Sequence, residues 1–179
     1  SFPDPVEDPL NGISIALSYP KWLIKRWISD HDLGWTTDFC RASNLVAPLT
    51  ARVNTLKISR QDLIEQLATE GVNAQPTAIS PDGIYLTGAN DLERLSVHTE
   101  GFFQVQDEAA QMVSHLVLPE QACQPQSVVD LCAAPGGKTT HLAQLMGNRG
   151  RVIAMDVSGE KIKLIEQNCQ RLGVRNVET

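Results

Sequence analysis

The sequence lacks the features that mark membrane-spanning and disulfide-stabilised proteins. Its apolar runs fall short of the about 18 residues that cross a bilayer, and its N-terminus has no signal-peptide pattern. Its four cysteines are scattered and form no CxxC pair, so the sequence predicts neither a zinc site nor a disulfide framework. These absences predict a cytoplasmic protein that has reduced thiols, no metal and no membrane partner.

An excess of positive charge is also missing. The chain holds 15 basic and 21 acidic residues, a formal net charge of −6, which weighs against a broad nucleic-acid surface. The charge is uneven, however, because residues 21–60 hold seven bases and three acids. Such a segment can contact a phosphate backbone locally, and a solvated helix face explains the same pattern. Charge alone leaves both interpretations open.

The composition is that of a folded protein. The 179 residues are 42% hydrophobic and 20% charged, enough for one good domain or two small ones. The opening has several prolines and acids and few apolar residues, which predicts a linker or arm over 1–18. A first helix is expected from Pro20 and a second near Thr37.

Strand and helix signals then alternate. Strands are expected over 51–56, 73–79, 84–87 and 101–106, with a helix after Ser59 and a short helix over 90–95. This β-α-β-β-α-β order predicts a ferredoxin-like (RRM-like) α+β domain. Many RNA-binding modules share that architecture, although the aromatic strand signatures of a standard RNA-recognition motif are missing. The sequence therefore predicts an accessory RNA-binding domain over 19–100, in which two helices precede the β-α-β-β-α-β unit.

The pattern changes near Asp107. An amphipathic helix precedes a continuous apolar run over 127–132, which is typical of a parallel strand buried on both faces. A turn, a helix, a second buried strand over 151–157 and another helix follow. The β-α-β-α-β order predicts the first half of a Rossmann-like, doubly wound sheet over 101–179.

The loop after the first of these strands carries the chemistry. Small residues and two glycines fill the segment between Asp130 and Lys138, where open α/β sheets bind ligands. Asp156 ends the next strand, nineteen residues after Gly137. An acid at that place can accept hydrogen bonds from both hydroxyls of a ribose.

Three cofactor interpretations compete for this loop. The end of a Walker A motif is present at Gly137-Lys138-Thr139, but Cys132 stands where the motif needs its first glycine. A dinucleotide fingerprint needs G-x-G-x-x-G, and here the glycines are adjacent. A nucleoside cofactor without phosphates, such as S-adenosylmethionine, fits best.

The motifs resemble a known family. DLCAAPGGKTTHLAQLM followed by VIAMDVS is similar to the cofactor-binding motifs of RNA cytosine-5 methyltransferases, and FFQVQDEAAQ to the segment that precedes them. YPKWLIKRW and TARVNTLK resemble the accessory region of one branch, the Sun/Fmu (RsmB-like) 16S ribosomal RNA cytosine-5 methyltransferases. The resemblance extends from about residue 19 to residue 179.

The resemblance implies S-adenosyl-L-methionine as cofactor and small-subunit ribosomal RNA as partner, with methyl transfer to carbon 5 of a cytosine. That base must be flipped or single-stranded for its ring to be reached. Asp156 would hold the ribose, and Asp130 would shape the loop or lie near the methionine ammonium. The cofactor-binding residues implied by the resemblance are Cys132, Ala133, Ala134, Pro135, Gly136, Gly137, Lys138 and Asp156.

No catalytic residue is predicted within the chain. In the family, two cysteines in Pro-Cys and Thr-Cys motifs do the chemistry, and both lie downstream of the segment that ends here at Thr179. We therefore expect a truncated piece of an rRNA methyltransferase that is inactive alone. The alternatives are a non-catalytic RNA-binding module, whose RNA affinity would not need Asp156, and a P-loop protein, which would bind ATP with magnesium.

Overall fold

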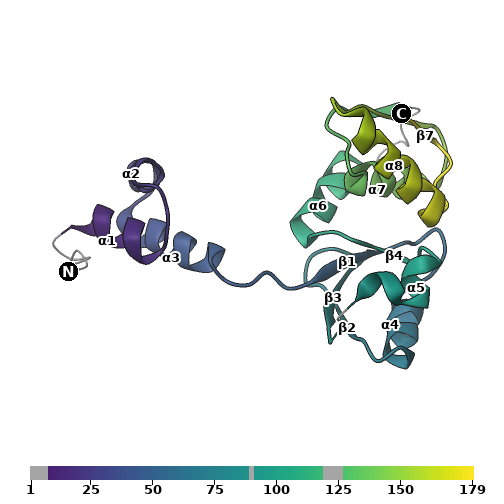
Figure 1. Ribbon diagram of the computed structural model, residues 1–179, viewed down its shortest axis with the longest axis horizontal. Helices are drawn as coiled ribbons and strands as arrows, with labels where there is room; N and C mark the ends of the chain where they lie inside the picture. The colour runs from purple at the N-terminus through teal and green to yellow at the C-terminus, as the bar shows by residue number, and fades with distance from the viewer. Residues whose placement is uncertain (1–7, 89–90, 119–126) are drawn as a thin grey trace. The chain divides into compact units, whose positions relative to one another are not determined.

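The computed structural model describes residues 8–88, 91–118 and 127–179 (Figure 1). The chain divides into two compact units, Ser1–Ala47 and Pro48–Thr179. This division does not follow the predicted boundaries after residues 18 and 100. Among the described residues, no helix has the length and apolar character needed to cross a membrane.

The first unit is helical. It contains α1 (Pro9–Ala16), α2 (Lys21–Asp30) and α3 (Leu33–Ser43). Their small core consists of Ile13, Ile24 and Cys40.

Two predictions for this unit are wrong. The predicted arm over 1–18 contains helix α1, because the Asp8 side chain accepts the N–H of Asn11 and Pro9 occupies the first helical turn. Asp8 and Pro9, which contributed to the linker prediction, are thus helix-start residues. The helix expected near Thr37 begins at Leu33, where Asp32 accepts the N–H of Trp35 at 2.7 Å.

The second unit begins with the ferredoxin-like domain, residues 48–106. Its elements are β1 (Thr50–Val53), α4 (Arg60–Thr69), β2 (Asn73–Pro76), β3 (Gly83–Thr87), the 3₁₀ turn η1 (Leu92–Arg94), α5 (Ser96–Thr99) and β4 (Phe103–Val105). The strands form an antiparallel sheet in the order β2-β3-β1-β4. The predicted ferredoxin-like fold is confirmed, with the short helix replaced by η1 and α5.

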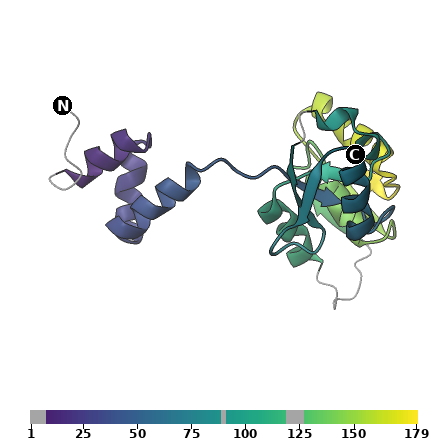
Figure 2. The same ribbon diagram turned by 90° about the horizontal axis from the view of Figure 1, so that it is seen from below.

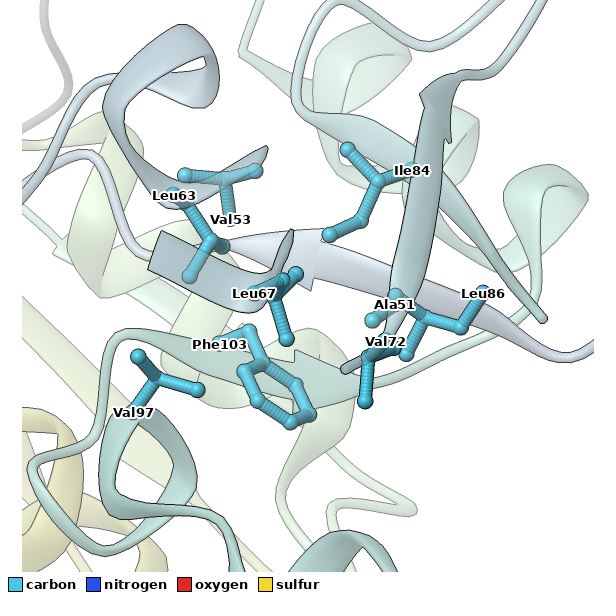
Figure 3. Close-up of a cluster of buried hydrophobic side chains, with 9 residues drawn as sticks. All are labelled: Ala51, Val53, Leu63, Leu67, Val72, Ile84, Leu86, Val97 and Phe103. Carbon is cyan, nitrogen blue, oxygen red and sulfur yellow. The ribbon is translucent and has the colours of Figure 1, made fainter. Parts of the chain in front are cut away.

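Strand β1 is buried on both faces. Side chains alternate along a strand, so Ala51 and Val53 lie on one face and Thr50 and Arg52 on the other. The first face joins an apolar core with α4, α5 and Phe103 (Figure 3). Its members are Ala51, Val53, Leu63, Leu67, Val72, Ile84, Leu86, Val97 and Phe103.

The rest of the second unit is the parallel region, residues 107–179. Its elements are α6 (Glu108–Val117), β5 (Ser127–Asp130), α7 (Gly137–Leu145), β6 (Arg151–Ala154), α8 (Gly159–Leu172) and β7 (Val177–Glu178). The strands pair in parallel in the order β5-β6-β7, as the first half of a Rossmann-like sheet does. Both views place this green-to-yellow region beside the ferredoxin-like domain (Figures 1 and 2).

Candidate cofactor-binding site

The small-residue loop joins β5 to α7 at the carboxyl edge of the parallel sheet. Its backbone is held internally, since the N–H of Ala133 donates to the carbonyl of Met155 at 3.0 Å and that of Gly136 to the carbonyl of Ala133 at 2.7 Å. Helix α7 starts directly after the loop at Gly137. The N–H groups of its first turn have no acceptor within the helix, so they are available to a ligand.

Gly136 is the position where only glycine fits. Its φ is +101°, and an added Cβ would lie 3.3 Å from the Cα of Ile165 on α8. Asn168, also on α8, donates to the carbonyl of Pro135 at 2.9 Å. Helix α8 therefore holds the loop from behind, while the opposite side of the loop stays open.

Asp156 follows β6 and lies beside the loop. One carboxylate oxygen accepts the N–H of Ala134 at 3.1 Å and the other accepts the N–H of Ser158 at 3.2 Å. The N–H of Ser158, and next that of Ala134, hold the pKa of Asp156 below its usual value. A carboxylate has about four lone-pair positions, so these two bonds leave capacity for ribose hydroxyls. Asp156 is not the N-cap of α8, a position that Ser158 occupies.

Asp130 shapes the loop from its other end. Its carboxylate accepts the N–H of Cys132 at 3.3 Å and the hydroxyl of Thr139 at 2.7 Å. In a P-loop, the hydroxyl at the position of Thr139 would be a magnesium ligand. Here Thr139 is buried and its hydroxyl is bonded to Asp130, which weighs against the P-loop interpretation.

A pocket opens between this loop and strand β4. The ferredoxin-like domain and the start of α6 supply one wall, with Gln104, Val105, Gln106 and Ala110. The other wall consists of Asp130, Cys132, Ala133, Ala134, Pro135, Gly137 and Lys138. The predicted residues are thus brought together except for two that do not line the pocket: Gly136, which packs on α8, and Asp156, which accepts the N–H of Ala134.

The pocket walls are joined by Arg52. Its guanidinium donates to the carbonyl of Gly137 at 2.6 Å, to Thr140 at 3.1 Å, to Gln144 at 3.2 Å and to Gln106. Burial lowers the pKa of Arg52 to about 9. Arg52 was counted in the basic segment that could contact RNA, but it is 1% exposed and belongs to this interior contact.

These contacts explain the structural role of the Arg52-Val53-Asn54 sequence. Arg52 bonds to α7, Val53 packs in the ferredoxin-like core, and Asn54 donates to the carbonyl of Leu172 in α8 at 2.8 Å. Arg52 and Asn54 therefore connect the ferredoxin-like domain to α7 and α8, and Val53 between them anchors the segment in its own core.

A group of polar residues in the same interface was not predicted. Asp82, His115 and His141 come from a turn, α6 and α7, and the ring Nε2 atoms lie 3.2 and 3.1 Å from one carboxylate oxygen of Asp82. No local spacing links three segments so far apart in sequence. Only the pairing of the two domains brings them together.

The described cysteines do not form a nucleophile site. Cys40 is buried, and burial raises the pKa of Cys169 to about 11. Cys132 is exposed on the cofactor loop, where it lines the pocket. Cys123 lies outside the described residues. A catalytic thiolate needs a lowered pKa, and neither Cys40 nor Cys169 has one.

The fold and the loop together define a Rossmann-like methyltransferase sheet preceded by a ferredoxin-like domain. Residues 19–93 match the family model of the RsmF/B-like methyltransferase ferredoxin-like domain, and residues 117–179 match that of the 16S rRNA methyltransferase RsmB/F. The chain therefore belongs to the RsmB/F methyltransferase family.

Individual relatives agree with this family. The chain is 32% identical over 171 residues to a probable ribosomal RNA small subunit methyltransferase B of Bacillus subtilis, covering 96% of this chain and 37% of the relative. It is 32% identical to a human 28S rRNA (cytosine(4447)-C(5))-methyltransferase, covering 92% of this chain and 20% of the relative. The chain thus spans a minor part of the curated relatives it matches.

A solved structure gives the same fold. The methyltransferase homologue protein from Pyrococcus horikoshii superposes with a TM-score of 0.81 at 31% identity. The match covers 96% of this chain and 55% of that chain. The similarity includes the ferredoxin-like domain as well as the parallel region, since nearly the whole chain is aligned.

Proposed function

We propose that this chain is the cofactor-binding and RNA-contacting part of a cytoplasmic enzyme that methylates carbon 5 of a cytosine in ribosomal RNA. The methyl donor would be S-adenosyl-L-methionine, which supplies an electrophilic methyl group. The observation that supports this most strongly is the hydrogen bond between Asp156 and the Ala134 N–H, which joins the two motifs at the carboxyl edge of the sheet.

The available groups suit a nucleoside cofactor without phosphates. Asp156 would accept the ribose hydroxyls, while residues Cys132 through Lys138 would surround the methionine part, with the first-turn N–H groups of α7 facing its carboxylate. The pocket wall from β4 would cover the cofactor on its second side. The nucleophile that attacks cytosine would come from another part of the enzyme.

We propose ribosomal RNA as the substrate, and RNA of the small subunit in preference to that of the large subunit. The bacterial relative is named for the small subunit and the human relative for 28S rRNA. A small-subunit fragment and a large-subunit fragment, compared in binding assays at several salt concentrations, would separate these substrates.

The cofactor proposal is tested by calorimetric titration with S-adenosylhomocysteine. Asp156→Asn keeps an acceptor for the Ala134 N–H but removes the charge that favours two hydroxyl donors. We expect the Kd to rise by about tenfold, equivalent to about 1.4 kcal/mol. Asp91→Asn, which removes the same charge from the N-cap of η1 in the ferredoxin-like domain, should leave the Kd unchanged.

Other outcomes would contradict the proposal. Binding of ATP with magnesium in place of S-adenosylhomocysteine would favour the P-loop interpretation. RNA binding that does not respond to Asp156→Asn, with no cofactor affinity, would favour a non-catalytic RNA-binding module.

A further inference from the structure

The strongest unassigned feature is the His–Asp cluster, which consists of Asp82, His115 and His141. The Nε2 atom of His141 lies 3.1 Å from Oδ2 of Asp82, and the Nε2 atom of His115 lies 3.2 Å from the same oxygen. The three ligand-type atoms all lie within 4.8 Å of one another. His141 is fully buried, and the side chains of Asp82 and His115 are 11% and 15% exposed.

We propose that Asp82, His115 and His141 bind a divalent transition-metal ion of the zinc class. Two imidazoles and one carboxylate are a common ligand set for such ions, and water would take the fourth position. With bonds of about 2.0 Å, the corners of a tetrahedral site lie about 3.3 Å apart. The two distances to Asp82 match that edge within about 0.2 Å.

The hydrogen bonding of the cluster is incomplete without a further ligand. One oxygen of Asp82 faces two ring nitrogens, but only His141 stands in hydrogen-bond geometry to it. Within the part of the chain that the structure describes, Nε2 of His115 has no hydrogen-bond partner. A buried polar atom without a partner costs free energy, and a cation between the three groups would use both nitrogen lone pairs.

The charges around the cluster set its expected selectivity. Asp82 is its anion, and the buried guanidinium of Arg52 also acts electrostatically on Asp82. Arg52 would weaken binding of a hard dication held by charge alone. Neutral imidazole nitrogens remain effective ligands beside Arg52. They bind zinc in preference to magnesium or calcium, which take oxygen ligands.

A bound ion would connect the two domains. Asp82 lies in the turn that enters β3 of the ferredoxin-like domain, whereas His115 and His141 belong to α6 and α7 of the parallel region. Helix α7 also begins at the cofactor loop. The ion would therefore hold the ferredoxin-like domain against the helix that forms one end of the proposed cofactor site, independently of whether the cofactor is bound.

The test is a titration of chelator-treated protein with Co²⁺, followed by competition with Zn²⁺. We expect one Co²⁺ per chain, with the strong visible absorption of a four-coordinate ion, and its loss on addition of Zn²⁺. The midpoint of thermal unfolding should rise when Zn²⁺ is present.

Shape-conserving variants locate the site. Asp82→Asn and His115→Gln should each raise the Kd for the metal by at least about tenfold. His98→Gln, which removes a histidine elsewhere in the ferredoxin-like domain, and Cys132→Ser, which removes an exposed thiol, should leave the Kd unchanged. His115 is partly exposed and its Nε2 is unbonded, so His115→Gln keeps the test decisive even where Asp82→Asn fails to fold.

Three results would overturn the proposal. They are absence of Co²⁺ binding at micromolar protein, a Kd that does not change in His115→Gln, and loss of binding in Cys132→Ser. Any of these results would mean that the cluster is a hydrogen-bonded contact between the two domains and not a metal site.

Discussion

The two sheets of the second unit differ in how completely their side chains are covered. The antiparallel sheet carries a nine-residue core in which Val53 and Phe103 are 0% exposed (Figure 3). The parallel sheet has its own core, yet Val129 on β5 is 52% exposed and Leu131 just beyond it is 69% exposed. The antiparallel sheet is therefore a stability element, whereas β5 leaves an apolar edge beside the candidate site.

The largest expected loss of stability comes from a substitution in the antiparallel sheet. Phe103→Ala removes a ring from the centre of the core, and we expect a loss of about 3–5 kcal/mol in the free energy of unfolding. Urea denaturation followed by circular dichroism measures it. A loss below about 1 kcal/mol would mean that the core relaxes around the cavity and that the two sheets are more alike than their burial indicates.

An intermediate loss of stability is expected at Glu108, which joins helix α6 to the ferredoxin-like domain. Its carboxylate accepts the N–H groups of Ile79 at 2.7 Å and Ser80 at 2.8 Å and the hydroxyl of Tyr85 at 3.0 Å. The Ser80 N–H is the largest of the causes that lower the pKa of Glu108 to about 2. This carboxylate should therefore stabilise the fold fully above pH 4.5 and progressively less as the pH falls toward 2.

Glu108→Gln tests this pH dependence. The variant keeps an acceptor oxygen but loses the charge, so we expect a loss on the order of 1 kcal/mol near pH 7. The difference between wild type and variant should shrink as the pH is lowered through the range between the two pKa values. A difference that is constant from pH 7 to pH 3 would contradict the assigned pKa.

The smallest change in stability is expected at the exposed apolar residues at the end of β5. Leu131→Ser replaces an exposed apolar side chain, and the free energy of unfolding should change by less than about 0.5 kcal/mol. Urea denaturation followed by circular dichroism measures the change in stability, and light scattering measures the molar mass of the protein in solution. A large loss of stability together with a fall in mass would show that a second copy covers this edge.

Local patterns were sufficient to predict much of the fold. The capping side chain of Ser59, the turn before β3 and the apolar run of β5 each act over a few residues, so the order of strands and helices was predictable. The small-residue loop and Asp156 were found for the same reason, since both follow strand ends. Helix α1 was missed because its N-cap Asp8 and its first residue Pro9 also suit a linker.

The sequence by itself determined the order of the elements, the family motifs and the position of the loop, because these depend on neighbouring residues. Only the tertiary structure decided that Arg52 is buried against α7 and that Asp82, His115 and His141 share one site. The physical reason is that these groups meet where the ferredoxin-like domain contacts helices α6 and α7 of the parallel region. Their pairing partners lie up to 92 residues away, and no local periodicity encodes such a contact.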